Sequence, residues 1–517
     1  MSRRGLGPRR WARPTLAIAA VVVAFAALSW LGGAGLAEAR PGGGDSYSGG
    51  GGHGGDSGGG GDGGALLELV FHLIRLCIYY PKVGLPILAI VIGFLLYSAY
   101  KKGQNKDWDS GPPVELARAI DLEPLRRLDP GFSQVVFEDF AFRLFSAAHR
   151  ARTSEQALAA VAPYVMAAAQ RALLTRTPAG QPVSSVVVGA MRTFRVDIPD
   201  QPVDAQGRPA RVRIGIEFEA NVTAGDKAAG GSPRTYFSVE SWLFGRVATA
   251  RSKEPGTAQT FPCPSCGAPW QASATGTQVC ASCGQSVDNG RFDWTVEQIS
   301  LASIDERPPT LTDEVRERGT DLPTYHQPGF DGRWHALLEG DPAVTEEAVL
   351  ARTRMIFDRL NEAWSVGKLD GARGLVSDGL FDSLQYWVDA YERAGLRNTL
   401  RDMRITHTTL CKLVRDRHYD ALTVRLWAKG KDFVVRTASG ELVKGSKNRD
   451  RAYSEYWTLI RSSARRGEVA TEPRCGNCGA PLAVTMAGAC EHCGAHLTRG
   501  EFDWVLSKIE QDDSYRG

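Results

Sequence analysis

Eight of the ten cysteines in this chain fall in two copies of one motif. Each copy has two Cys-x2-Cys pairs, which are separated by 13 residues in the first copy and 11 in the second. Four thiolates at this spacing suit a tetrahedral zinc ion, as in a zinc ribbon. We therefore predict two structural Zn²⁺ sites, with the ligands Cys263, Cys266, Cys280, Cys283, Cys475, Cys478, Cys490 and Cys493. A redox dithiol is the alternative, but it would need only one pair in each domain.

Catalysis has weaker candidates in the sequence. His407, Asp416 and His418 could supply an acid–base pair. Asp416 and His418 fall in a charged turn, and His407 stands alone on an expected strand. Because the three residues suggest no dyad with plausible geometry, we expect that the protein is not an enzyme.

The zinc motifs belong to a longer repeat. Asp129-Pro130 recurs as Asp341-Pro342, 212 residues later, and each four-cysteine motif ends on Gly-x-Phe-Asp-Trp. A register that holds over more than one hundred residues indicates a tandem duplication. Three further features recur with it: Phe145 and Phe357; Glu240-x-Trp242-x3-Arg246 and Glu455-x-Trp457-x3-Arg461; and the closing tryptophans Trp294 and Trp504.

Within each repeat, hydrophobic residues have helical spacing first and strand spacing afterwards. The expected second helical segments are 155–174 and 369–394, and the expected strands are 184–198, 210–222 and 235–249, then 404–416, 419–429, 432–437 and 453–462. This order predicts an α+β fold with two cone-like rolls, in which helices pack on a curved antiparallel sheet. The rolls are expected at 129–250 and 341–465, each followed by a zinc ribbon at 251–305 and 466–511, with a linker at 306–340.

Two segments of the second repeat resemble a known family. Ala363-Trp364-Ser365-x-Gly367-x-Leu369-Asp370 and Glu455-Tyr456-Trp457-Thr458-Leu459-Ile460-Arg461 are similar to the Tim-like domain family, which has a nuclear-transport-factor-2-like fold. That family includes the docking subunit of the mitochondrial inner-membrane import motor. The resemblance covers 341–465 well and 129–250 more loosely, and the ribbons depart from the family pattern. It implies a membrane-associated adaptor that binds a protein partner.

The amino-terminal region predicts membrane attachment. Residues 1–39 have a basic start, an apolar run and a small-x-small site, so they read as a signal peptide, with an uncleaved first span as the alternative. A glycine-rich spacer (40–64) and an interfacial segment (65–82) follow. Residues 83–100 are uncharged, long enough to cross a bilayer, and followed by Lys101 and Lys102, which mark the cytoplasmic side. Residues 101–128 are a linker to the first roll.

Charge and cysteine usage narrow the function further. The formal net charge is +3, and the first 39 residues alone carry five arginines and one glutamate, so the remaining chain is close to neutral. A near-neutral body makes nucleic acid an improbable partner. Eight metal-spaced thiols need a reducing compartment, which agrees with a bacterial inner-membrane protein whose bulk is cytoplasmic.

The combined expectation is a single-pass membrane protein that acts as an adaptor or scaffold. A basic loop in the second repeat adds an expected contact with anionic lipid; its residues are Lys429, Lys431, Arg436, Lys444, Lys447, Arg449 and Arg451. The alternative is a roll that binds a small ligand or catalyses a reaction in its cone. Polar side chains converging inside the cone would favour that alternative, and aromatic filling would favour the scaffold.

Overall fold

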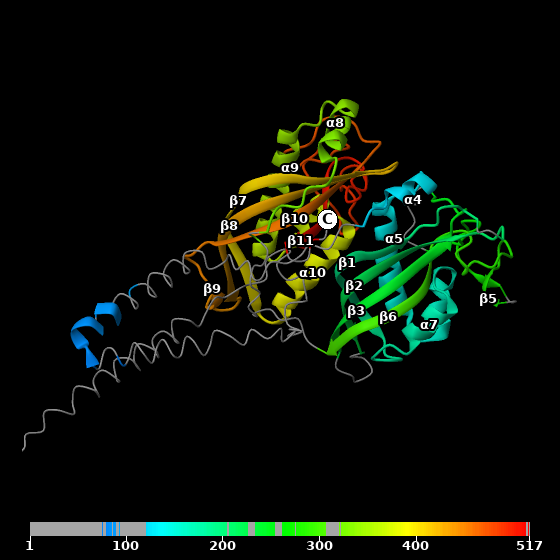
Figure 1. Cartoon of the computed structure of the whole chain (residues 1–517), viewed down its shortest axis with the longest axis horizontal. Coiled ribbons are helices and arrows are strands. Elements are labelled where there is room, and N and C mark those ends of the chain that lie inside the picture. The colour runs from blue at the N-terminus through cyan, green and yellow to red at the C-terminus, as the bar shows by residue number, and fades with distance from the viewer. Residues whose placement is uncertain are drawn as a thin grey trace, which may run out of the picture.

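The computed structural model contains two α+β units, which lie side by side in Figure 1. It describes residues 120–203, 206–225, 233–253, 261–273, 276–306 and 322–512, with Thr320, Tyr515, Gly517 and scattered positions between 75 and 93. The predicted signal peptide, glycine-rich spacer and most of the predicted span at 83–100 lie outside these residues. Among the described residues, no helix is both long and apolar enough to cross a membrane.

The first unit packs short helices against a four-stranded antiparallel sheet. Its helical part comprises α4 (Glu123–Leu128), α5 (Gln134–Ala151), α6 (Glu155–Leu158), the 3₁₀ turn η1 (Ala159–Tyr164) and α7 (Ala167–Leu174). The sheet has the order β1-β2-β3-β6 and is formed by β1 (Val183–Asp197), β2 (Arg211–Ala224), β3 (Arg234–Val247) and β6 (Thr295–Glu306). The small β4 (Ala272–Ser273) and β5 (Gly276–Cys280) form a separate hairpin in the first four-cysteine region.

The second unit repeats this order, with longer helices and longer first two strands. Its helical part comprises α8 (Phe330–Gly340), α9 (Glu346–Val366), η2 (Leu369–Leu375) and α10 (Asp378–Arg393). The sheet order is β11-β10-β8-β7, and β9 pairs with the end of β8. These strands are β7 (Leu396–Arg415), β8 (Tyr419–Arg436), β9 (Leu442–Gly445), β10 (Arg451–Ser462) and β11 (Val505–Gln511).

Each four-cysteine region is inserted between the third and fourth strands of its sheet. β6 pairs along β3, with Gly245 opposite Thr295, and β11 pairs along β10, with Ile460 opposite Val505. The structure thus places 295–306 and 505–511 in the sheets, whereas the sequence predicts them in ribbons that follow the rolls. Likewise, α4 and α8 precede the two Asp-Pro pairs and pack on the units, although the sequence predicts both segments as linkers.

The expected helices at 155–174 and 369–394 are each interrupted by a short extended step. Val165 forms a parallel bridge with Val296, and Val376 forms one with Leu506. Each bridge ties the middle of the helical segment to the fourth strand, so the chain leaves the helix there. The bridge itself cannot be predicted locally, because the partner residue lies about 130 positions further along the chain.

The two units contact each other directly. Val187 of β1 belongs to the buried core of the second unit. The ring of Phe142 faces Gly379, and the Lys508 ammonium lies 2.6 Å from the Glu138 carboxylate. The sequence leaves the packing of the units open, and these contacts join them.

Candidate metal centres

In the first four-cysteine region, the sulfurs converge from two tight turns. The distance between the sulfurs of Cys263 and Cys283 is 3.9 Å, and between those of Cys266 and Cys280 it is 4.0 Å. A disulfide would require about 2.05 Å, and all four cysteines are free thiols. The sulfurs all lie within 4.8 Å of one another, so they could hold one metal ion.

The second four-cysteine region has the same geometry. The sulfurs of Cys475 and Cys493 are 3.8 Å apart, and those of Cys478 and Cys490 are 3.9 Å apart. Zinc–sulfur bonds of about 2.3 Å in a tetrahedron give sulfur–sulfur edges of about 3.8 Å. All eight cysteines predicted as ligands therefore lie in two clusters that fit a tetrahedral ion. Soft thiolates with no oxygen ligand favour zinc over a hard cation.

Glycine makes each turn possible. Gly267, Gly284, Gly479 and Gly494 follow the second cysteine of each pair, and all four have φ between 70° and 75°. This left-handed backbone is accessible to glycine without a Cβ penalty. Each of these glycines donates its N–H to the carbonyl of the first cysteine of the pair, at 2.8–2.9 Å, which closes the turn around the sulfurs.

The thiols within each cluster differ in acidity. Burial raises the pKa of Cys280, but amide N–H groups of Cys283 and Ser282 outweigh it and leave the pKa at about 6. The Ala495 amide and the Asn477 side chain lower the pKa of Cys493 to about 6. Burial raises the pKa of Cys263 and of Cys475 to about 12. Metal binding must therefore displace protons from some ligands in each cluster.

Each ribbon is fastened to its own roll through the 3₁₀ turn. In the first unit, Tyr164 Oη donates to the Pro262 carbonyl at 2.7 Å, and Trp270 Nε1 donates to the Ala159 carbonyl at 2.8 Å. In the second unit, buried Arg373 donates through Nε to the Met486 carbonyl at 3.0 Å. These contacts hold the metal clusters against η1 and η2.

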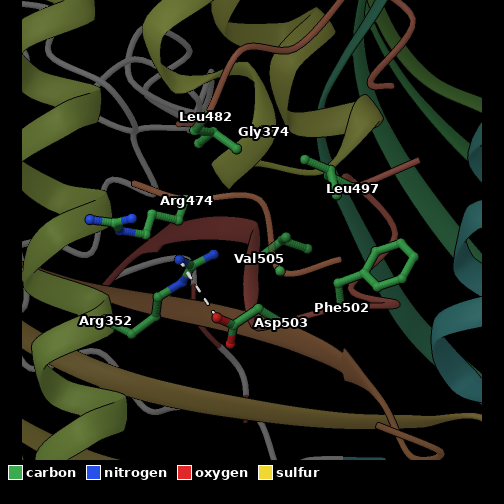
Figure 2. Close-up of a pocket in the computed structure, with 9 residues that line it drawn as sticks. Arg352, Gly374, Arg474, Leu482, Leu497, Phe502, Asp503 and Val505 are labelled. Carbon is green, nitrogen blue, oxygen red and sulfur yellow. Dashed lines mark ion pairs between the residues drawn. The ribbon is translucent and has the colours of Figure 1, made fainter. Parts of the chain in front are cut away.

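A crevice marks the junction in the second unit, between α9, η2 and the ribbon (Figure 2). Its volume is about 10 Å³, about enough for one water. The Arg352 guanidinium lies 3.7 Å from the Asp503 carboxylate and donates to the Trp504 carbonyl at 3.1 Å. A Cβ on Gly374 would lie 2.7 Å from a methyl of Val484, so a side chain there would push the ribbon away.

The repeated Asp, Arg and Trp residues meet in one buried cluster in each unit. In the first, the Arg246 guanidinium lies 2.5 Å from the Asp129 carboxylate and 4.4 Å from the centre of the Trp294 ring. We call this group, and its counterpart in the second unit, the Asp–Arg–Trp cluster. It ties the start of the helical layer, the third strand and the end of the ribbon together.

The second Asp–Arg–Trp cluster repeats these contacts. Arg461 lies 3.1 Å from the Asp341 carboxylate and 4.9 Å from the centre of the Trp504 ring. Gly500 is the first residue of the second Gly-x-Phe-Asp-Trp motif and has φ of 74°. A Cβ at this position would lie 2.7 Å from the Ile460 carbonyl oxygen. The repeated tryptophans are thus core and ribbon-docking residues.

The interior of the first roll is filled by aromatic rings around one buried carboxylate. Phe145, Phe218, Trp242 and Phe244 are all fully buried. Trp242 Nε1 donates to Glu240 at 3.0 Å. The same carboxylate lies 3.4 Å from His149 Nε2 and 3.2 Å from Arg176 Nε, within ion-pair distance of both side chains.

Glu240 is charged in this environment. Burial raises the pKa of Glu240, but the charge and hydrogen bond of His149, the charge of Arg176 and the Trp242 N–H together lower it to about 2. In the second roll, Trp457 Nε1 donates to Glu455 at 2.9 Å, so this part of the arrangement is repeated. Two residues near Glu240, His149 and Arg152, are not repeated: Asn361 and Trp364 stand 212 positions after them.

The candidate catalytic residues do not form one site. Asp416 accepts the N–H groups of His418 and Tyr419 at 2.8 Å and so shapes the turn between β7 and β8. His407 lies nine residues earlier on β7, about 30 Å away along an extended strand, and its ring is 5.0 Å from that of Trp427. The arrangement offers no acid–base pair between His407 and the turn.

Sequence reasoning missed the residues that dock the ribbons and those that surround Glu240. Arg352 and Arg373 have no counterparts at the same offset in the first unit, where Phe140 and Val161 stand, so the repeat did not mark them. Glu240 was visible as part of the repeated Glu-x-Trp pair. Its partners His149 and Arg176 come from other elements and have no sequence signature.

The comparisons with known proteins match one segment of the chain, within the second unit. The family model described as the Tim44-like domain matches residues 334–469. No curated protein matches the chain at a significant level. The match begins within α8, runs past the end of β10 and stops before the second cysteine cluster. Over residues 334–469, the chain is similar to the Tim44-like domain.

Proposed function

We propose that this protein is a membrane-anchored, cytoplasm-facing adaptor without enzymatic activity, in which two zinc ions stabilise the docking platform. The Tim44-like domain suggests a membrane-associated scaffold or adaptor. In this proposal, residues 83–100 form a single span and the two units present their surfaces to a protein partner. The metal would be held by the eight cysteines of the two clusters and would supply structural stabilisation only.

The observation that carries the proposal is the repeated Asp–Arg–Trp cluster. It joins the helices, the sheet and the ribbon of each unit into one body through groups that are almost completely buried. A ribbon of this size cannot bury an adequate core alone, so the metal and the docked roll must stabilise it together. Such construction favours a rigid surface for a partner over a roll that opens for a substrate.

Aromatic filling of the first roll supports the same conclusion. The rings of Phe145, Phe218 and Trp242 occupy the space where a ligand would lie, with ring centres 4.3–5.7 Å apart. The sequence analysis takes aromatic filling of the cone as a sign of a scaffold and converging polar side chains as a sign of a ligand-binding roll. The aromatic filling of the first roll therefore favours the scaffold. The second unit also places Phe357 against Trp457, with ring centres 5.8 Å apart.

A small-ligand-binding first roll is the second candidate. The guanidinium groups of Arg152 and Arg176 are buried near one carboxylate, that of Glu240, so cations are in excess in this region. The same set could receive the anionic group of a ligand if the roll opened. The second unit lacks these cations, so this candidate concerns the first roll alone.

Membrane topology tests the main proposal. In a bacterial host, the full chain should stay in the membrane fraction after an alkaline wash. Protease added to spheroplasts should leave both units intact, whereas protease added to inverted inner-membrane vesicles should digest them. Extraction by alkali, or digestion of the units from outside the cell, would contradict the proposal.

A further inference from the structure

The outer face of the second sheet, opposite α9 and α10, carries a cation and an aromatic ring side by side. Val424 belongs to the core beneath the helices, so its neighbour Arg425 points to the outer face. Tyr456 points there for the same reason, beside Trp457 of the core. Arg425 and Tyr456 are only 1% and 2% exposed. Two segments cover them, one before α8 and one after β11.

The segment before α8 holds both side chains in place. Arg425 Nη1 donates to the Leu322 carbonyl at 2.8 Å. The Tyr325 N–H donates to the Tyr456 hydroxyl at 3.0 Å. Residues 322–327 therefore orient the guanidinium and the phenol, and we call them the covering segment.

Two residues after β11 supply the remaining contacts. The Asp512 carboxylate lies 2.8 Å from Arg425 Nη2. The ring of Tyr515 stacks on that of Tyr456, with ring centres 3.9 Å apart and planes at 8°. Figure 1 marks this end of the chain beside β10 and β11. We call Asp512 and Tyr515 the docked residues; they are an acidic and an aromatic side chain three positions apart.

The first unit has the opposite charge on its outer face. Glu217 and Arg425 each precede the residue that pairs with the repeated glutamate of the third strand. Glu217 lies 3.5 Å from Arg192 on the neighbouring strand β1, so it has a cation within its own sheet. Arg425 instead receives a carboxylate from outside the sheet. The outer face of the second unit is thus built to receive an acidic group.

We propose that this face binds an extended segment of a partner protein, in which an acidic side chain is followed three residues later by an aromatic one. The docked residues occupy the site when no partner is bound. Because the covering segment orients Arg425 and Tyr456, the site is formed in advance. A partner carboxylate would replace Asp512 with the same charge and keep the buried guanidinium paired. The inference rests on the proposed adaptor function, for which it names a surface.

Amide hydrogen exchange of the unmodified full chain in detergent tests whether the site is formed in advance. The Tyr515 N–H donates to the Gln511 carbonyl at 2.9 Å, so its exchange reports release of the docked residues. The Tyr325 and Gln327 amides both donate to the sheet and report on the covering segment. The Tyr515 amide should exchange about tenfold faster than these two, because it can open locally. Equal exchange at all three would mean that both segments leave together, and it would overturn the proposal.

A dye-labelled peptide of residues 509–517 tests recognition. A full chain with Asp512→Ser and Tyr515→Ala should bind this peptide, measured by fluorescence polarisation. It should bind at least about tenfold tighter than the unmodified chain, whose tethered residues compete at a high effective concentration. Asp512→Asn in the peptide should weaken binding about tenfold, because a charged hydrogen bond is lost.

Glu510→Gln in the peptide is the matched control, since it removes the same charge from a residue of β11 and should leave binding unchanged. If the peptides with Asp512→Asn and Glu510→Gln bind equally, or if no peptide binds either chain, the proposed recognition is wrong. The exchange experiment needs no variant, so it decides the proposal even where the altered chain does not fold.

Two further outcomes identify the occupant and separate this inference from the anchor. If the altered chain forms a complex with the unmodified chain, seen by light scattering, the docked residues exchange between copies and a separate partner is contradicted. A chain that resists the alkaline wash but binds no peptide refutes only this surface. A chain that alkali extracts but that binds the peptide refutes only the anchor.

Discussion

The two units share the Asp–Arg–Trp cluster and differ in the residues inside the roll. Both connect Asp, Arg and Trp across the start of the helical layer, the third strand and the end of the ribbon. Inside the first roll, His149 and Arg176 surround Glu240. In the second, Asn361 and Trp364 stand at the positions of His149 and Arg152, and Trp364 Nε1 donates to Asn398 at 2.7 Å.

The comparison distinguishes the residues that attach the ribbon from the residues of the roll interior, which can differ between the units. The residues of the Asp–Arg–Trp cluster contact the ribbon or the strand that leads into it. Losing one of them would therefore detach the metal site from the roll. His149 and Arg176 lie within ion-pair distance of Glu240 in the interior of the first roll, so one unit could carry a charged set there and the other a neutral one. The shared Asp–Arg–Trp cluster therefore indicates a common way of joining roll and ribbon, and the differing residues inside the rolls indicate where the units have separate roles.

The largest expected effect comes from removing a metal ligand in either unit. Cys280→Ser and Cys490→Ser should each reduce bound zinc from two ions to one per chain, measured by elemental mass spectrometry. Structural zinc contributes about 10–16 kcal/mol of apparent binding free energy, so the affected ribbon should unfold. Cys411→Ser changes a buried thiol outside both clusters and should keep two ions. Different results for the two ligands would mean that the ribbons are not equivalent.

Breaking the Asp–Arg–Trp cluster should have the next largest effect. Arg246→Met and Arg461→Met each leave a buried carboxylate without its guanidinium, which costs about 3–5 kcal/mol of unfolding free energy. Urea unfolding of the full chain in detergent, followed by tryptophan fluorescence, measures this cost. Adding Asp129→Leu to Arg246→Met should recover much of the loss. If the double variant is no more stable than the single one, the carboxylate was not the cause.

Acid should destabilise the first roll through Glu240. Its folded pKa of about 2 lies below the ordinary value of 4.5, so the stabilisation is present above pH 4.5 and is lost as the pH falls toward 2. A shift of this size corresponds to about 3 kcal/mol. Glu240→Gln should flatten the dependence of unfolding free energy on pH between about 4.5 and 3. An unchanged pH profile in this variant would show that Glu240 is not held charged.

Loosening the contact between the units should have the smallest effect. Lys508→Gln removes the ion pair with Glu138, whose side chains are 31% and 15% exposed. A partly exposed pair contributes about 1 kcal/mol or less. Calorimetry should show a small decrease in stability with both units still folded. Arg474→Gln removes an exposed pair within the second ribbon and should have no measurable effect on the contact between the units.

The sequence predicted the features that repeat. The cysteine spacing identified both clusters, and the Glu-x-Trp-x3-Arg repeat marked residues that lie together in each core. The insertion of each ribbon into its sheet was not predictable, because β6 reads as a weakly alternating segment with Ser300, Leu301 and Ala302 in succession. Its partner β3 lies about fifty residues earlier, beyond any local pattern.

The long strand β8 is a second feature that depends on a neighbouring strand and could not be predicted from its own sequence. The sequence pattern predicts a break at Gly430, where a glycine normally weakens a strand. In the structure the strand continues through Gly430. Only glycine fits there, because a Cβ would lie 2.8 Å from the Met403 Cα, at an irregularity in β7. The need for glycine here comes from the neighbouring strand, which the local sequence cannot reveal.

The metal content of the full-length chain, purified in detergent under reducing conditions, tests the central claim most directly. Elemental mass spectrometry should give two zinc ions per chain, and a thiol reagent should reach eight further thiols only after chelation. That result would support both clusters and a reducing compartment. A chain without metal, with four disulfides in place of the eight thiols, would contradict the zinc sites and the cytoplasmic placement together.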